Sequence, residues 1–176
     1  MPSNHDLERD NDQRNQGGRT ETDVRLWRML PSQRRPTRWR VVAIKGEGLC
    51  PFWQFFEKFK HEDPKEYIRL KVALSKMADY GPSKRCHRAE HSTKHHEILV
   101  YPMKSGDMYW FHGNRVRVNG ETVVGRKSSM VISHVSTQSS PEVRQLQTEK
   151  AIRHRETLGK ALQISSFEDL CDDHPW

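Results

Sequence analysis

The clearest pattern of hydrophobic positions lies between residues 50 and 81. Two apolar stripes recur there at intervals of three and four residues, which is the spacing of one face of an α-helix. The first stripe consists of Phe52, Phe55, Phe56 and Phe59, and the second of Tyr67, Leu70, Leu74 and Met77. The pattern predicts two short amphipathic helices that form a hairpin and bury a shared apolar face against a sheet.

Residue types that are typical of helix ends bound these two helices. Pro51 suits the first position of the first helix. Asp63 is the predicted N-cap of the second helix, with Pro64 at its first position and Glu66 in the place that completes a capping box. Gly81 is the predicted C-cap, and the proline that follows it cannot continue the helix.

Short runs of β-branched and aromatic residues predict strands on both sides of the helical hairpin. The first strand, residues 39–44, precedes the helices. The others follow them, at residues 97–101, 108–112, 115–118, 121–124 and 130–135. Asn119-Gly120 separates two of these runs and is a strong signal for a two-residue hairpin turn.

A last helix is predicted after the strands. Ser140 is its N-cap, Pro141 occupies its first position, and it extends to about residue 162. We expect its basic residues to lie on the surface: Arg144, Lys150, Arg153 and Arg155. The order of elements predicts an α+β fold, in which an N-terminal strand and a helical hairpin pack on a mostly antiparallel sheet that a C-terminal helix follows.

Composition divides the chain of 176 residues into three parts. Residues 1–38 form a predicted arm, which is polar and disordered to about residue 22 and then holds a short helix and a basic, proline-broken connector. Residues 39–162 form the predicted folded domain. Residues 163–176 form an acidic tail that is either loose or a short docking segment.

The charge of the chain favours an anionic partner. The net charge is +7 and the isoelectric point is about 9.5, so nucleic acid is the first candidate and an acidic protein the second. No apolar run is long enough for a transmembrane helix, and the polar N-terminus does not resemble a signal peptide. The odd number of cysteines, without paired spacing, fits reduced thiols in the cytoplasm.

Segment 84–96 concentrates basic residues and histidines. His87, His91 and His95 recur every four residues, so on a helix they would share a face and could bind zinc or nickel. The segment follows a helix stop, however, and the chain offers no second ligand pair at a typical metal spacing. The simpler interpretation is a basic loop beside a phosphate-binding groove, with no metal.

The sheet carries the second group of candidate residues. Alternation places Tyr109 and Phe111 on one face of their strand, and Trp110 and His112 on the other. An exposed tyrosine or tryptophan beside basic residues would suit unpaired RNA bases, because rings stack on bases while cations neutralise phosphates. His134 lies late in a hydrophobic strand, where a histidine is either a catalyst or a satisfied core residue.

The span from about residue 39 to residue 158 resembles the RelE/HigB-like toxin superfamily, and within it the phage-derived-protein branch. The resemblance rests on the order and spacing of a helix such as CPFWQFFEKF, a second helix ending like LSKMADYG, and a basic stretch. Strands similar to HHEILVY, MYWFHG and MVISHV follow, and then a helix that opens with Ser140-Pro141-Glu142. The resemblance implies a compact RelE-like α+β fold.

It also implies a function in toxin–antitoxin systems. Members are mRNA interferases, endoribonucleases that usually act on ribosome-bound mRNA and are neutralised by a cognate antitoxin protein. Their chemistry needs no metal or cofactor: basic residues hold the phosphate, and a His, Tyr or Lys transfers protons. The candidates here are His112, His134 and Tyr109 for catalysis, and Arg88, Lys104, Arg115, Lys84 and Arg85 for phosphate binding.

The chain departs from the family at three places that usually supply positive charge. Glu97 is followed by isoleucine where the branch usually has arginine, the strand at 108–110 lacks its usual arginine, and the loop at 136–140 lacks a usual pair of lysines. The hairpin at 115–124 looks like an insertion. The alternative is therefore a catalytically inactive RelE-fold protein of a phage or mobile element, which binds nucleic acid or a protein partner.

Overall fold

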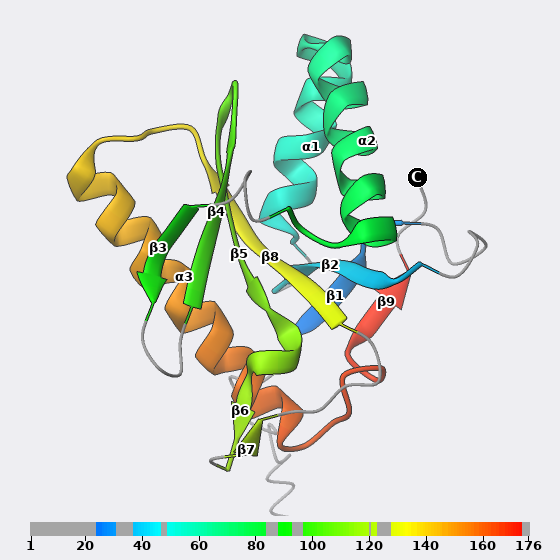
Figure 1. The fold of residues 1–176 in the computed structure, drawn as a ribbon, viewed down its shortest axis with the longest axis vertical. Helices are drawn as coiled ribbons and strands as arrows, with labels where there is room; N and C mark the ends of the chain where they lie inside the picture. The colour runs from blue at the N-terminus through cyan, green and yellow to red at the C-terminus, as the bar shows by residue number, and fades with distance from the viewer. Residues whose placement is uncertain are drawn as a thin grey trace, which may run out of the picture.

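A seven-stranded sheet runs through the chain, and helices cover both of its faces (Figure 1). The computed structural model describes residues 24–30, 37–46, 49–83, 88–92, 97–119, 121–122 and 128–173, with the backbone alone at 91, 92, 115, 117, 121 and 122. The strands of the main sheet are β1 (Arg25–Arg28), β2 (Trp39–Lys45), β3 (Arg88–Ser92), β4 (Glu97–Met103), β5 (Gly106–His112), β8 (Ser128–Ser136) and β9 (Cys171–Asp173). The helices are α1 (Pro51–Glu62), α2 (Pro64–Tyr80), α3 (Pro141–Leu162) and the 3-10 turn η2 (Gly113–Arg115).

The strands lie in the order β3-β4-β5-β8-β2-β1-β9. Strand β2 is parallel to β8 and β1 is parallel to β9, whereas the other neighbours are antiparallel. The predicted α+β class with a mostly antiparallel sheet is therefore confirmed at this level. A separate pair, β6 (Arg117–Val118) and β7 (Glu121–Thr122), forms the predicted hairpin in a shorter version, with Asn119 at a φ of 51° in its turn.

The helical hairpin forms where the sequence predicts it. The Asp63 carboxylate accepts a hydrogen bond from the backbone N–H of Glu66, which satisfies one of the free donors at the start of α2. Gly81 ends α2 with a φ of 85°, and its N–H donates to the carbonyl of Met77. Proline occupies the first turn of both helices. Local capping therefore fixes the length of the hairpin.

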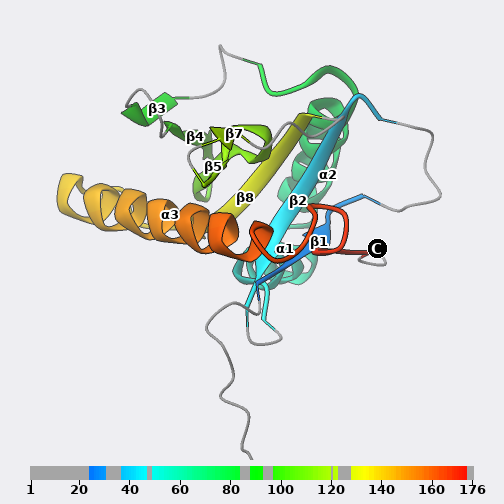
Figure 2. The same ribbon diagram turned by 90° about the horizontal axis from the view of Figure 1, so that it is seen from below.

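The sheet separates two hydrophobic cores, because side chains alternate between its faces. On one face α1 and α2 bury Phe52, Phe56, Leu74 and Met77 against Trp110 and Ile132. On the other face α3 buries Ala151 and Leu158 against Val42, Val131 and Phe111. Figure 2 shows α3 on one side of β2 and β8, and α1 and α2 on the other. The predicted docking of the hairpin on one sheet face is confirmed.

The helix predicted within residues 23–38 is wrong, because residues 25–28 form strand β1. The run of apolar residues around β1 is so short that it fits both the period of an α-helix and the period of a β-strand. Leu26 packs in the α3 core and Trp27 against the α1–α2 core, which is the alternation of a strand. Strand β1 lies outside the predicted 39–162 domain, yet it pairs with β2 along its whole length.

At the level of single elements, two further expectations are corrected and one open alternative is decided. The basic segment after Gly81 was expected to be irregular, but its residues 88–92 form β3. Part of the acidic tail docks, because residues 171–173 form β9 beside β1. Arg155 was expected on the surface, but it is only 3% exposed and donates from Nη1 to the carbonyl of Glu97 at 3.3 Å.

Candidate functional site

One row of side chains crosses four strands on the sheet face that α3 covers. Arg88 of β3 lies opposite Val100 of β4, Val100 opposite Tyr109 of β5, and Tyr109 opposite His134 of β8. Residues that are directly opposite point to the same face of a sheet. Three of the predicted site residues, Arg88, Tyr109 and His134, are thus brought into one row.

Tyr109 and His134 stack at the centre of this row. Their ring centroids are 5.0 Å apart and their planes differ by only 4°. Tyr109 is fully buried and His134 is 1% exposed, while the phenol oxygen has no hydrogen-bond partner in the part of the chain that the structure describes. The expectation of an exposed aromatic base platform is therefore wrong, because Trp110, on the opposite face, is also buried.

An irregularity in β8 places a serine beside the stacked Tyr109 and His134, and together with His154 these residues form a buried cluster. The pairing of β5 with β8 shifts between Tyr109 and Trp110, so Ser133 is an extra residue next to His134. Ser133 Oγ lies 2.7 Å from Nδ1 of His134 and 2.7 Å from Nδ1 of His154 in α3. A hydroxyl has one proton to donate, so Ser133 donates to one imidazole and accepts from the other. This reciprocal arrangement suits two neutral histidines.

Burial lowers the pKa of both histidines. The pKa of His134 falls from 6.5 to about 3, mainly because burial disfavours the charged form, with Lys150 and His154 adding to the effect and Gln147 opposing it. The pKa of His154 falls to about 4 for the same main reason, with Lys150 and Arg153 contributing. Burial also raises the pKa of Tyr109. At neutral pH the cluster therefore holds two uncharged imidazoles and a protonated phenol.

Charged groups surround the outer end of the row. Arg88 forms ion pairs with Glu90 and with Asp107 of β5, the latter at 3.3 Å. The carboxylates of Asp107 and Glu90 add to the raised pKa of Tyr109, whereas Arg88 and Arg144 of α3 oppose it. The Arg88 side chain is 42% exposed, so it remains open to a ligand from solvent.

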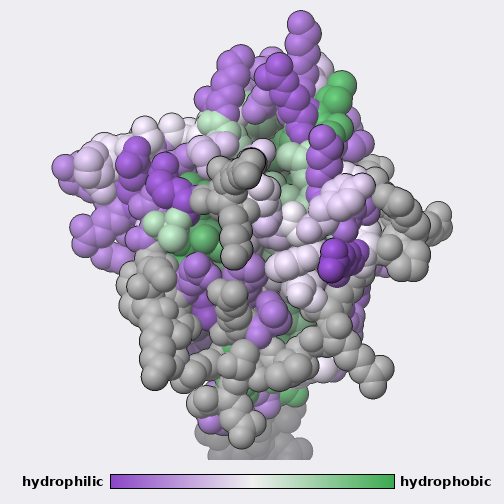
Figure 3. Space-filling view, in the orientation of Figure 1, coloured by the Kyte–Doolittle hydropathy of each residue, from purple (hydrophilic) through white to green (hydrophobic). Residues whose placement is uncertain are grey.

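A groove of about 510 Å³ opens beside this end of the row, between β3 and the first half of α3. It is lined by Glu90, Pro141, Arg144, Gln145, Thr148, Glu149 and Ile152. Hydrophilic side chains gather over the same half of α3, at the left of Figure 3. Arg144 Nε is buried and has no partner among the described residues. The groove thus offers an accessible surface next to the buried cluster.

The other predicted site residues do not join the row. His112 lies on the opposite face, where its ring is 5.6 Å from that of Trp39 and 4.9 Å from that of Trp110. Lys104 is exposed in the β4–β5 turn, at one end of β5, and the backbone of Arg115 lies in η2, beyond the other end. Lys84 and Arg85 lie outside the described residues.

Sequence reasoning missed several members of the cluster. His154 and Arg144 were not recognised because α3 carries charge around most of its surface. Arg144, Gln147, Ala151 and His154 recur at intervals of three and four residues, so they share one face of the helix. This spacing was the signal that could have placed them on the side of α3 that faces the sheet. Ser133 and Asp107 gave no local signal, because their roles depend on strand pairing.

The described residues contain no group of three or more His, Cys, Asp or Glu side chains placed to hold a metal ion. The side chains of His87, His91 and His95, the predicted alternative metal set, lie outside the described part. Among the helices that the structure describes, none has the length and apolar character needed to cross a membrane. The chain matches no protein-family model, and no curated protein or solved structure matches it significantly.

Proposed function

We propose that this chain is a RelE/HigB-like toxin that acts in the cytoplasm as an endoribonuclease on mRNA, free or bound to the ribosome. The observation that carries the proposal is the row formed by Arg88, Tyr109 and His134 beside the β3–α3 groove. These residues are far apart in the sequence, and together they offer what RNA cleavage needs, a cation for the phosphate and groups that transfer protons. A cognate antitoxin protein is part of the same proposal.

The proposed reaction requires no metal. The ribose 2′-oxygen attacks the adjacent phosphorus and the bond to the 5′-oxygen breaks, which leaves a 2′,3′-cyclic phosphate and a 5′-hydroxyl. A base takes the 2′-hydroxyl proton, and an acid returns a proton to the leaving oxygen. His154, half-buried and unprotonated at neutral pH, is the proposed base, with His134 behind it through Ser133. Tyr109 is the proposed acid because its raised pKa keeps the phenol protonated.

Positive charge at the groove is the second requirement. Arg88 and Arg144 flank the outer end of the row and would hold the phosphate and stabilise its developing charge. Direct contact between RNA and Tyr109 requires the first half of α3 to move away from β5, because that ring is fully buried. Closure over a bound nucleotide would exclude water from the reacting groups.

The same burial favours a second candidate function. A histidine that is 1% exposed, with a pKa near 3, cannot protonate a leaving group at neutral pH. A catalytically inactive protein of the same fold, which binds nucleic acid through Arg88, Arg144 and the surface of α3, would keep this buried cluster as a polar element of its core. The three family positions that lack positive charge also favour this candidate.

Cleavage and binding assays distinguish the two candidates. We expect purified protein to cut mRNA and leave 2′,3′-cyclic phosphate ends, with growth arrest on induced expression. Arg88→Gln and Tyr109→Phe should each lower the cleavage rate by about 100-fold, the size of a phosphate or proton-transfer contribution. His61→Gln, an exposed histidine on α1, is the matched control and should leave the rate unchanged.

The contrary outcomes are distinct. RNA that is bound but remains intact, both with and without translating ribosomes, would reject the endoribonuclease and support the inactive RNA-binding protein. RNA that is neither bound nor cut would reject both. Thermal melting of each variant shows whether a lost activity comes from a lost fold.

A further inference from the structure

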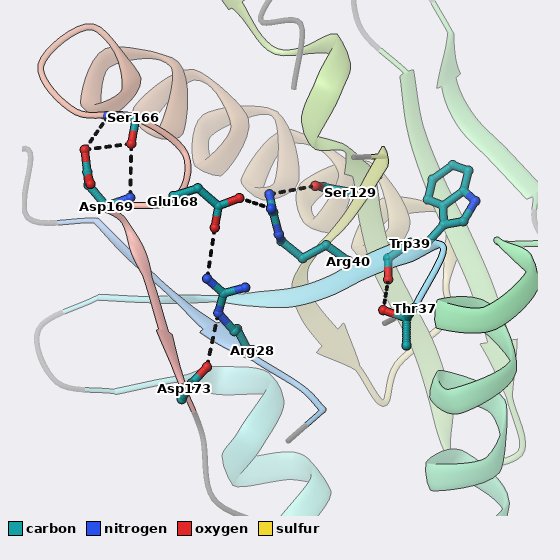
Figure 4. Close-up of polar contacts among 9 residues, drawn as sticks. All are labelled: Arg28, Thr37, Trp39, Arg40, Ser129, Ser166, Glu168, Asp169 and Asp173. Carbon is teal, nitrogen blue, oxygen red and sulfur yellow. Dashed lines mark hydrogen bonds and ion pairs between the residues drawn. The ribbon is translucent and has the colours of Figure 1, made fainter. Parts of the chain in front are cut away.

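At the end of the sheet formed by β1 and β9, one carboxylate pairs with two arginines at once. The Glu168 carboxylate bridges two guanidinium groups, with Oε2 3.0 Å from Nη2 of Arg28 and Oε1 in contact with Nη2 of Arg40 (Figure 4). Arg28 comes from β1 and Arg40 from β2, and each uses a different oxygen of the same carboxylate. Two guanidinium groups around one doubly accepting anion are the geometry that binds a phosphate.

The acidic segment that supplies this carboxylate continues along the same edge. Asp173 pairs with Nε of Arg28 at 3.1 Å, and Asp172 forms a bidentate pair with Arg25. Arg25 also donates to the backbone carbonyl of Asp169 at 2.9 Å. Three arginines of β1 and β2 are thus covered by three carboxylates of one short segment, which forms a turn at 167–170 and then strand β9. The phosphates of a nucleic acid strand that follows this edge would cover the same arginines.

Arg40 adds a planar cation and a free donor to the surface, and an aromatic ring of the covering segment stacks on it. The Arg40 guanidinium lies over the Phe167 ring at 4.8 Å, and its Nε is buried with no partner among the described residues. Planar arginine groups stack on nucleobases in the same way that Arg40 stacks on this ring. The surface therefore offers both contacts that single-stranded RNA uses, charge for the phosphates and a flat cation for a base.

The carboxylates of the covering segment are held weakly enough to be exchanged, whereas Leu170, which is 5% exposed, anchors the segment itself in the α3 core. Strand β9 has three residues and pairs only with β1, at the last position in the sheet. The side chains of Glu168 and Asp173 are 58% and 55% exposed, and ion pairs at such positions stabilise little because water screens them. A polyanion that engages three arginines at once competes favourably with them, because it also releases counterions.

We propose that Arg25, Arg28 and Arg40 form a second binding surface for single-stranded RNA, which the acidic segment 167–173 covers as an internal mimic of the phosphate backbone. This edge of the sheet is opposite to β3 and to the Arg88 row. The inference rests on the proposed action on RNA, but it concerns a different surface. Displacement of its carboxylates from these arginines would provide substrate RNA with a second contact along the sheet.

The test measures binding of a fluorescent 2′-O-methyl oligouridylate by anisotropy, because this probe lacks the hydroxyl that cleavage needs. The variant Glu168→Gln/Asp172→Asn/Asp173→Asn removes the covering charges. We expect its affinity to rise by about 10-fold, and its plot of log affinity against log salt to become steeper by about 2, since three more phosphates are neutralised. Glu57→Gln/Glu62→Gln/Glu156→Gln is the control, with the same change of net charge on α1 and α3.

Adding Arg25→Gln/Arg28→Gln to the first variant should remove the gain, and Glu168→Gln alone should show part of it if the triple variant does not fold. A gain no larger than that of the control, or one that survives the loss of both arginines, would overturn the covered surface while leaving the proposed function intact. Failure of every protein, including the wild type, to bind the probe would reject both.

Discussion

Gly81 shows how a single residue is fixed by both backbone and packing. Its φ is 85°, and a Cβ at this position would lie 2.5 Å from Nε1 of Trp39. We expect Gly81→Ala to lower the free energy of unfolding by about 2 kcal/mol, from backbone strain together with displacement of the indole. Chemical denaturation measures the change. Gly46→Ala is the matched control, because nothing lies within 4 Å of its added Cβ, and an equal loss there would contradict the steric explanation.

The buried histidines make stability depend on pH. His134 faces Tyr109 and the α3 residues Gln147, Lys150 and His154, and its pKa is lowered from 6.5 to about 3. Below pH 6.5 the unfolded chain takes up a proton that the folded chain does not, so stability is complete above that pH and falls as pH decreases toward 3. At about pH 5, the lowered pKa of His134 alone should reduce the free energy of unfolding by about 2 kcal/mol.

Unfolding free energies at about pH 7.5 and about pH 5 test this dependence. His134→Gln, which has no charge at either pH, should shrink the difference between the two values, and His154 should account for much of the rest. The exposed His61→Gln should retain the full difference. An undiminished difference in His134→Gln would place the pH dependence elsewhere.

At the scale of elements, the N-terminus of α3 determines how the helix covers the sheet. The backbone N–H of Val143 donates to Ser140 Oγ at 3.3 Å, and Pro141 occupies the first turn. We expect Ser140→Ala to cost about 1 kcal/mol of unfolding free energy through the loss of this cap. Ser139→Ala, one residue earlier and also exposed, should be nearly neutral in the same thermal melts. Equal effects would show that the cap does not hold α3.

At the scale of the whole molecule, two cores share one sheet, so neither should unfold alone. Phe56 of α1 is fully buried in one core, and Leu158 of α3 is fully buried in the other. Replacing either with alanine should cost about 3–4 kcal/mol, through lost burial and a residual cavity, and should shift a single transition. Tryptophan fluorescence and far-UV circular dichroism should follow the same curve in both variants. Two separate transitions would contradict a shared sheet, and Ile68→Ala, 59% exposed, is the near-neutral control.

Features that the sequence predicted are those that depend on neighbours along the chain. The limits of α1, α2 and α3 follow from caps at Asp63, Gly81 and Ser140, because each cap satisfies or ends backbone hydrogen bonds within a few residues. The strand alternation at Tyr109 and Trp110 was equally local, and the two residues do point into different cores. Charge predicted an anionic partner, but it did not indicate which surface would meet that partner.

Tertiary structure alone decided the pairings between distant residues. Whether residues 25–28 form a helix or a strand depended on β2 and β9, since the short apolar run fits both. Burial of Arg155 and Tyr109 depended on α3 crossing the sheet, and the stacking of Tyr109 on His134 on the register of β5 with β8. Arg25 meets Asp172 at a separation of 147 residues. Such contacts form only once the chain has folded, because no local pattern encodes which distant strand will be the neighbour.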